Sequence, residues 1–145
     1  MSARIARWLL SIAALFIMAC GGGDKRRAEV HDIEGEVWDH CEEFVYSNKD
    51  SLALRDIAII VRYDMDYVAD SVPLRILTIS PDSLIYEEPF TLHIPHLADM
   101  YPEEQTFIYR RNVTLQHKGD YRFRITPEEP VEGIMAVGMV VSEKE

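Results

Sequence analysis

Apolar and polar residues alternate with a period of two through much of this chain, and this pattern limits the folds open to it. The alternation is clearest in segments 57–63, 74–79, 90–94, 121–126 and 134–141. Successive side chains of a strand point to opposite faces, so each segment can bury one face and expose the other. No long segment downstream of the N-terminus shows the period of an amphipathic helix. The sequence therefore predicts an all-β protein.

Turn-forming residues separate these segments, at 47–50, 70–73, 80–83, 118–120 and 127–130. About seven or eight short strands at this spacing predict an antiparallel β-sandwich, of jelly-roll or immunoglobulin-like topology, because each strand needs a second sheet against its apolar face.

Two segments lead to more specific expectations. Segment 134–141 is apolar on both faces, which predicts a central strand. Segment 97–105 is polar and contains Pro102, which predicts a loop or a single helical turn.

Residues 1–19 have the features of an export signal. Arg4 and Arg7 precede an apolar run at 8–19 that is broken only by Ser11. As a helix this run would span about 18 Å, well short of a bilayer core of roughly 30 Å. We therefore expect a cleaved signal peptide at 1–19 and not a permanent membrane span.

The junction Ala19-Cys20 resembles a bacterial lipobox, in which the cysteine is acylated and the signal is cut just before it. Ordinary signal cleavage beside an incidental cysteine is the alternative. Acyl chains on Cys20 would anchor the chain to a membrane. The residues after Cys20 favour the periplasmic face of the outer membrane, with the inner membrane as the alternative. The predicted organisation is a signal peptide (1–19), a flexible tether (20–28) and a β-sandwich domain (29–145).

The chain carries a formal net charge of −10, and the predicted signal contains arginines but no acidic residue. The mature protein is therefore more acidic still. A body of this charge is not expected to bind nucleic acid or to be attracted by anionic lipid headgroups.

The histidines do not indicate a metal site. His93 and His96 stand three residues apart and would face opposite sides of an extended strand. His31, His40 and His117 are scattered singly along the chain. No shared metal or cofactor is expected.

The sequence also lacks a recognisable catalytic group. Once Cys20 is acylated, Cys41 is the remaining thiol, and we expect it to be a small buried side chain near a strand. The acidic residues occur as adjacent pairs such as Glu42-Glu43, whose side chains diverge on a strand. We expect no catalytic residue and no enzyme activity.

Three turns share the pattern Asp-Ser-aliphatic, with the serines at Ser51, Ser71 and Ser83. This triplet resembles the acceptor pattern for periplasmic O-glycosylation in Bacteroidetes. Ordinary turn chemistry explains the same residues, since Asp and Ser both favour turns.

The C-terminal part of the chain resembles the gliding-motility lipoprotein GldH family. The similarity lies in Gly119-Asp120-Tyr121-Arg122-Phe123 and in segment 130–138, Pro-Val-Glu-Gly-Ile-Met-Ala-Val-Gly. It implies a lipid-anchored, non-enzymatic accessory component of the gliding or type IX secretion apparatus, whose partners are envelope proteins.

A second hypothesis remains open. A lipid-anchored β-sandwich could instead bind a ligand such as a glycan, through the expected loop aromatics Tyr67, Tyr86 and Tyr101.

Overall fold

The computed structural model describes residues 25–96 and 100–144. Their secondary structure consists of strands and one short 3-10 helix: β1 (Arg26–Asp32), η1 (Glu34–Glu36), β2 (Val37–Trp38), β3 (Glu42–Asn48), β4 (Leu54–Tyr63), β5 (Val72–Ile79), β6 (Ile85–Leu92), β7 (Glu103–Thr114), β8 (Gly119–Pro127), β9 (Val131–Glu132) and β10 (Ile134–Glu143).

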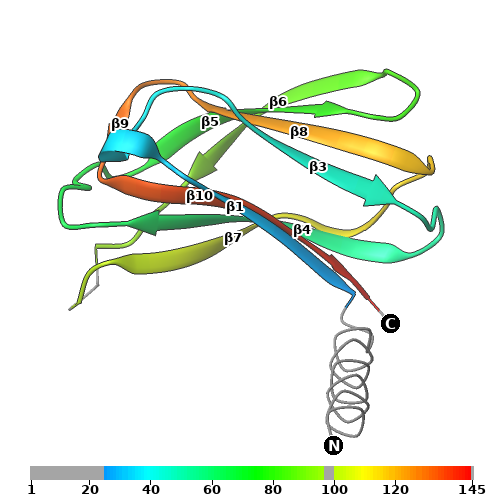
Figure 1. The fold of residues 1–145 in the computed structure, drawn as a ribbon, viewed down its shortest axis with the longest axis horizontal. Coiled ribbons are helices and arrows are strands. Elements are labelled where there is room, and N and C mark those ends of the chain that lie inside the picture. Colours follow the sequence, from blue (N-terminus) through cyan, green and yellow to red (C-terminus); the bar gives the residue numbers. More distant parts are fainter. Residues whose placement is uncertain (1–24, 97–99, 145) are drawn as a thin grey trace, which may run out of the picture.

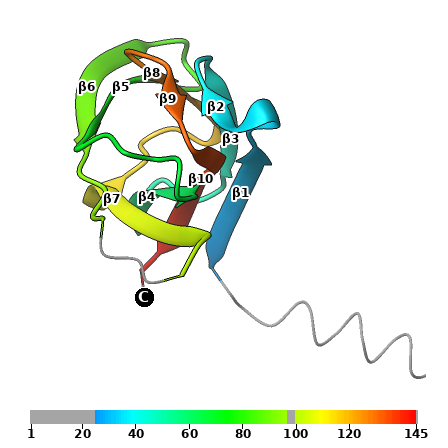
Figure 2. The same ribbon diagram turned by 90° about the vertical axis from the view of Figure 1, so that its left-hand side faces the viewer.

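Two four-stranded antiparallel sheets form the layers of a sandwich (Figures 1 and 2). One sheet has the order β1-β10-β4-β7 and the other β3-β8-β5-β6, while β2 and β9 form a small separate ladder. The chain pairs with itself like one long hairpin, since β1 pairs β10, β2 pairs β9, β3 pairs β8, β4 pairs β7 and β5 pairs β6. Rolling this hairpin adds the pairs β10–β4 and β8–β5. The predicted β-sandwich is confirmed, and its strand order is that of a jelly roll.

The core lies between the inward faces of the two sheets. Ile59 and Val61 of β4 face Leu74 and Ile76 of β5 across the interior, and all four are fully buried. These residues belong to the alternating segments of the sequence, so the period-two pattern arises because each sheet has one core face. The predicted central strand is confirmed as well, because β10 lies between β1 and β4.

The structure corrects two sequence-based boundaries. Strand β7 begins at Glu103, inside the segment expected to be a loop, and continues to Thr114. It is the outermost strand of its sheet, so much of its surface stays polar and the alternation of the sequence did not single it out. Strand β1 begins at Arg26, whereas residues up to 28 were expected to be tether. Pairing with β10 explains this, because Arg26 lies opposite Ser142.

The predicted lipid-attachment residue Cys20 lies outside the described residues, as does the signal segment before it. In the described ranges, the structure contains no helix of the length and apolarity needed to cross a membrane.

Candidate functional site

A sandwich of two sheets has two open sides, and one side of this sandwich is closed by side chains. There the outermost strands are β6 and β7, and the Phe90 and Tyr109 rings pack edge to face at 5.3 Å. Glu88 accepts hydrogen bonds from the Tyr109 hydroxyl and from Arg110. Burial and the bond to Glu88 raise the pKa of Tyr109 far above its usual value. These contacts join β6 to β7 across this side of the sandwich.

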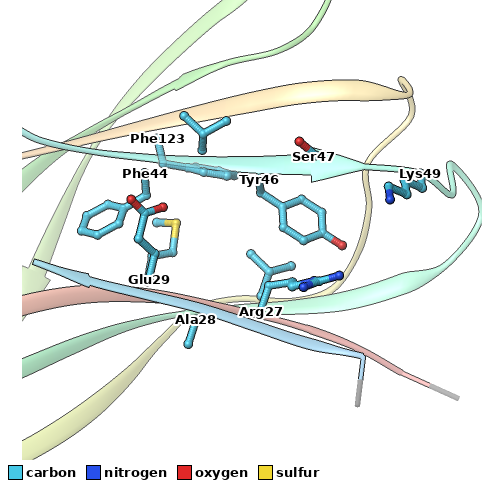
Figure 3. Close-up of a pocket in the computed structure, with 11 residues that line it drawn as sticks. Arg27, Ala28, Glu29, Phe44, Tyr46, Ser47, Lys49 and Phe123 are labelled. Carbon is cyan, nitrogen blue, oxygen red and sulfur yellow. The ribbon is translucent and has the colours of Figure 1, made fainter. Parts of the chain in front are cut away.

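The opposite side, between the outermost strands β1 and β3, contains a cleft of about 270 Å³ (Figure 3). Apolar side chains of the core form its inner wall: Phe44, Phe123, Met139 and Val141. Tyr46 of β3 and Arg27 and Glu29 of β1 extend into it from the two strands. The cleft therefore combines an apolar floor with a polar rim, as ligand sites in proteins commonly do.

Strand β1 places charged side chains where a core strand would place apolar ones. Arg27, Glu29 and His31 lie opposite the core-facing residues of β10, so they face the interior side of the sheet. Charges that point inward from an outermost strand discourage non-specific pairing with other chains. The open cleft keeps these side chains in contact with water, so their charges are not fully desolvated.

Two histidines meet at one end of the cleft: His31 from strand β1 and His40 from the connection between β2 and β3. His31 Nδ1 lies 2.7 Å from Glu42 Oε2, and His40 Nε2 lies 2.7 Å from Glu42 Oε1. The second ring nitrogen of His31 lies 2.7 Å from Glu29, and that of His40 lies 3.0 Å from Asp39. The His31 ring also stacks on Phe44, with centroids 4.4 Å apart. These contacts join β1 to β3, and the sequence, which treats the histidines as isolated, did not predict them.

This geometry favours the protonated form of both histidines. A neutral imidazole has one N–H donor, whereas each ring here faces carboxylates on both nitrogens. Burial alone would lower the pKa of His31, but its hydrogen bonds to Glu29 and Glu42 outweigh burial and raise it. Hydrogen bonds to Asp39 and Glu42 raise the pKa of His40.

We expect the stability gained from His31 to decrease as the pH rises. A raised pKa in the folded state means that the stabilisation is fully present below the unfolded value of about 6.5 and is lost as the pH passes the folded value. The free energy of unfolding of wild type should exceed that of His31→Gln by more at about pH 5.5 than at about pH 8.5. Urea unfolding at both pH values measures this difference. A difference that stays constant with pH would contradict the prediction.

The other end of the cleft is basic. Arg27, Tyr46 and Lys49 continue from the cleft into a smaller hollow of about 200 Å³, beside Arg55. The Arg55 side chain is 1% exposed, donates to Asp50 O at 2.8 Å and to Tyr46 Oη at 3.1 Å, and lies 4.0 Å from the Glu143 carboxylate. Its charge is therefore held mainly by neutral acceptors.

Three carboxylates meet away from the cleft. Oxygens of Glu36, Asp64 and Asp66 lie within 4.8 Å of one another. A hydrogen bond to Asp64, together with the charge of that residue, raises the pKa of Glu36. The sequence did not predict this cluster because it joins η1 to the segment after β4.

The expected binding aromatics do not form a common surface. Tyr67 lies in the loop between β4 and β5, but it is 2% exposed and stacks on His96, so its side chain is not available to bind a ligand. Burial raises its pKa. Tyr86 is exposed on β6, and Tyr101 packs edge to face against Tyr63 at 6.3 Å.

The remaining candidate residues are separated in the structure. His96 Nε2 lies 2.8 Å from Ala69 O, while His93 is exposed just after β6. Cys41 is exposed, so the expectation of a buried thiol is wrong. It lies in the short connection from β2 to β3, outside either sheet, where the core does not reach it.

The three predicted glycosylation serines lie in turns that precede strands. Ser51 and Ser71 are half-buried and Ser83 is exposed, before β4, β5 and β6 respectively. At the first turn Asp50 Oδ1 accepts a hydrogen bond from Leu52 N at 2.9 Å, which is ordinary turn chemistry. Glycosylation of these serines stays a prediction.

The fold and the cleft define a jelly-roll sandwich with one open side. Comparisons with known proteins do not assign this sandwich to a family. No protein-family profile matches the chain, and no curated protein matches it. Among solved structures, dimeric latent PorU from Porphyromonas gingivalis is similar over 83% of this chain, with a TM-score of 0.39 and 6% identity. This chain spans only 13% of that PorU chain.

A carbohydrate-binding module specific for non-crystalline cellulose, CBM28, is similar over 81% of this chain and 80% of its own. The TM-score is 0.41 and the identity 9%. Both similarities are distant, and we carry no site residue over from either structure.

Proposed function

We propose that the protein is a lipid-anchored, non-enzymatic accessory component of the bacterial envelope, and that it holds an extended segment of a partner protein at the β1/β3 cleft. The observation that carries this proposal is the cleft of about 270 Å³ between two outermost strands. Within the described part of the chain, β1 and β3 each have one edge without a strand partner. An extended polypeptide can hydrogen-bond to such an edge while its side chains enter the neighbouring pocket.

The apparatus that we propose is the gliding-motility or type IX secretion machinery. Support comes from the sequence, through the GldH-like residues of segment 119–138 and the lipobox at Cys20. We propose the periplasmic face of the outer membrane as the location. Anchoring there would raise the effective concentration of the sandwich near a membrane-bound partner without any new contact.

A bulky side chain at the rim of the cleft should abolish function without unfolding the protein. Arg27 is exposed on β1 and extends into the cleft, so Arg27→Trp should block access while leaving the core unchanged. Thr91→Trp is the matched control, because Thr91 is an exposed residue of β6 on the closed side. Each variant is tested by complementation of a deletion strain at matched abundance, scoring secretion or motility. Full complementation by Arg27→Trp would exclude the cleft as the binding site.

Two further variants in the same assay test the anchoring and the absence of catalysis. Cys20→Ala should lose function even when it is exported and folded, whereas His93→Ala should retain it. A normally folded His93→Ala variant without function would favour a catalytic or ligand-binding reading instead.

A further inference from the structure

The strand registers divide the sandwich into two ends of different composition. We call one the terminal end, because β1 begins and β10 ends there (Figure 1); it comprises residues 25–27, 48–56, 79–85, 110–120 and 142–144. The distal end comprises residues 32–42, 62–72, 92–96, 100–104 and 126–135. Asn48 Nδ2 of β3 holds the connection from β7 to β8 at the terminal end, by donating to Leu115 O at 2.8 Å and to His117 O at 2.7 Å.

Basic residues predominate at the terminal end. They are Lys25, Arg26, Arg27, Lys49, Arg55, Arg110, Arg111, Lys118 and Lys144. Fewer acidic residues accompany them: Asp50, Asp56, Asp82, Asp120 and Glu143. Even with Asp24 and Glu145, which adjoin this end in the sequence, the basic side chains remain in excess.

The distal end has the opposite charge. Its acidic residues are Asp32, Glu34, Glu36, Asp39, Glu42, Asp64, Asp66, Asp70, Glu103, Glu104, Glu128, Glu129 and Glu132. Arg62 is the one lysine or arginine in the described residues of this end. The net negative charge of the chain is therefore concentrated at the distal end.

Several cations of the terminal end are available to a partner. Lys49, Arg111 and Lys118 are exposed, and none of them forms an ion pair within residues 25–96 and 100–144. Apolar exposure does not distinguish the two ends, since Leu52 is 85% exposed at one and Val68 is 80% exposed at the other. Charge does distinguish them.

The position of the predicted anchor determines which end meets the membrane. Lys25 follows Cys20 by five residues, which span at most about 18 Å when extended. The ten-residue strands β4 and β10 carry the distal end roughly 33 Å further away. The Debye length at physiological salt is about 8 Å, so the potential of a charged bilayer acts on the terminal end and hardly on the distal end.

We infer that the terminal end docks on the anionic phospholipid headgroups of the membrane that holds Cys20, and that this contact orients the sandwich with its acidic end outward. The inference rests on the lipid anchor of the proposed function. It revises the sequence-based expectation that anionic headgroups would not attract the protein. That expectation used the net charge, whereas the membrane senses the charges within a Debye length.

Fluorescence energy transfer from Cys41 tests the orientation. Cys41 is exposed near the distal end, and it is the remaining thiol once Cys20 is acylated. The mature lipoprotein, labelled at Cys41, is reconstituted into vesicles of phosphatidylcholine that contain a headgroup-labelled acceptor. We expect added phosphatidylglycerol to lower the transfer, because the distal end is then held away from the surface. Salt at about 0.5 M should restore the transfer by screening.

Two triple variants of equal net charge provide the decisive comparison. Lys49→Glu/Arg111→Glu/Lys118→Glu should lose the effect of phosphatidylglycerol. The control variant should keep this effect, because its three exposed arginines lie within strands β5 and β8, outside the residues of the terminal end; it is Arg75→Glu/Arg122→Glu/Arg124→Glu. The inference is overturned if wild type shows no effect of phosphatidylglycerol, or if both triple variants lose the effect equally.

Flotation of the vesicles separates this inference from the proposed anchor. Wild-type protein that floats with both kinds of vesicle supports acylation. Flotation only with phosphatidylglycerol would support the docking surface and refute the anchor, and flotation with neither would refute both.

Discussion

Replacing Phe123 by alanine is expected to lower the free energy of unfolding by about 3–5 kcal/mol, as for other buried aromatic residues. Phe123 is 2% exposed in β8, where it lies between Phe44 of β3 and Thr78 of β5 in the register of the sheet. It also forms part of the cleft floor. Truncation removes buried apolar area and leaves a void that neighbours on both sides cannot fill. Urea unfolding measures the loss.

Val45→Ala is the matched control for Phe123→Ala. Val45 belongs to β3 and is 41% exposed, on the face opposite Phe44. Its truncation should cost less than about 1 kcal/mol, because exposed strand positions contribute little. A loss below about 1 kcal/mol for Phe123→Ala as well would show that β8 is packed less tightly than its burial implies.

Gly133→Ala is the second substitution for which we expect a large loss, of at least about 3 kcal/mol. Gly133 has φ +82°, and a Cβ added there would lie 2.2 Å from Tyr67 N. The neighbour is backbone, so a side-chain rotation cannot relieve the overlap. The alanine must therefore adopt a left-handed conformation and displace the chain around Asp66 and Tyr67. The midpoint and slope of urea unfolding report the loss.

Gly35→Ala separates the two contributions to this loss. Gly35 has φ +74°, but an added Cβ would meet nothing within 4 Å. Its replacement should therefore cost only the left-handed backbone preference, about 1–2 kcal/mol. Equal losses at Gly35 and Gly133 would mean that the contact with Tyr67 relaxes freely.

The strands that the sequence predicts are those with one face in the core. Alternation identified the segments around Ile59, Leu74 and Phe123 because burial of alternate residues requires it. It did not identify β7, whose outermost position leaves polar residues on much of its surface. The sequence also suggested Tyr67 as a loop aromatic for binding, whereas contacts with Tyr63 and His96 bury its side chain.

The site was less predictable than the fold for a related reason. His31 and His40 meet at Glu42 only because β1 and β3, which belong to different sheets, lie at the same open side. Sequence spacing describes neighbours within one strand and says nothing of contacts between layers. The cleft follows from the same arrangement of outermost strands.

The sequence by itself determined the class of fold, because its period-two pattern requires strands that each bury one face, and it determined the net charge of −10. Only the tertiary structure decided where that charge lies. Rolling the hairpin brings Arg26, Lys49, Lys118 and Lys144 to one end, although they are far apart in the chain. Electrostatic attraction depends on distance in space and is screened within about 8 Å, so an acidic chain can still present a basic surface to a membrane.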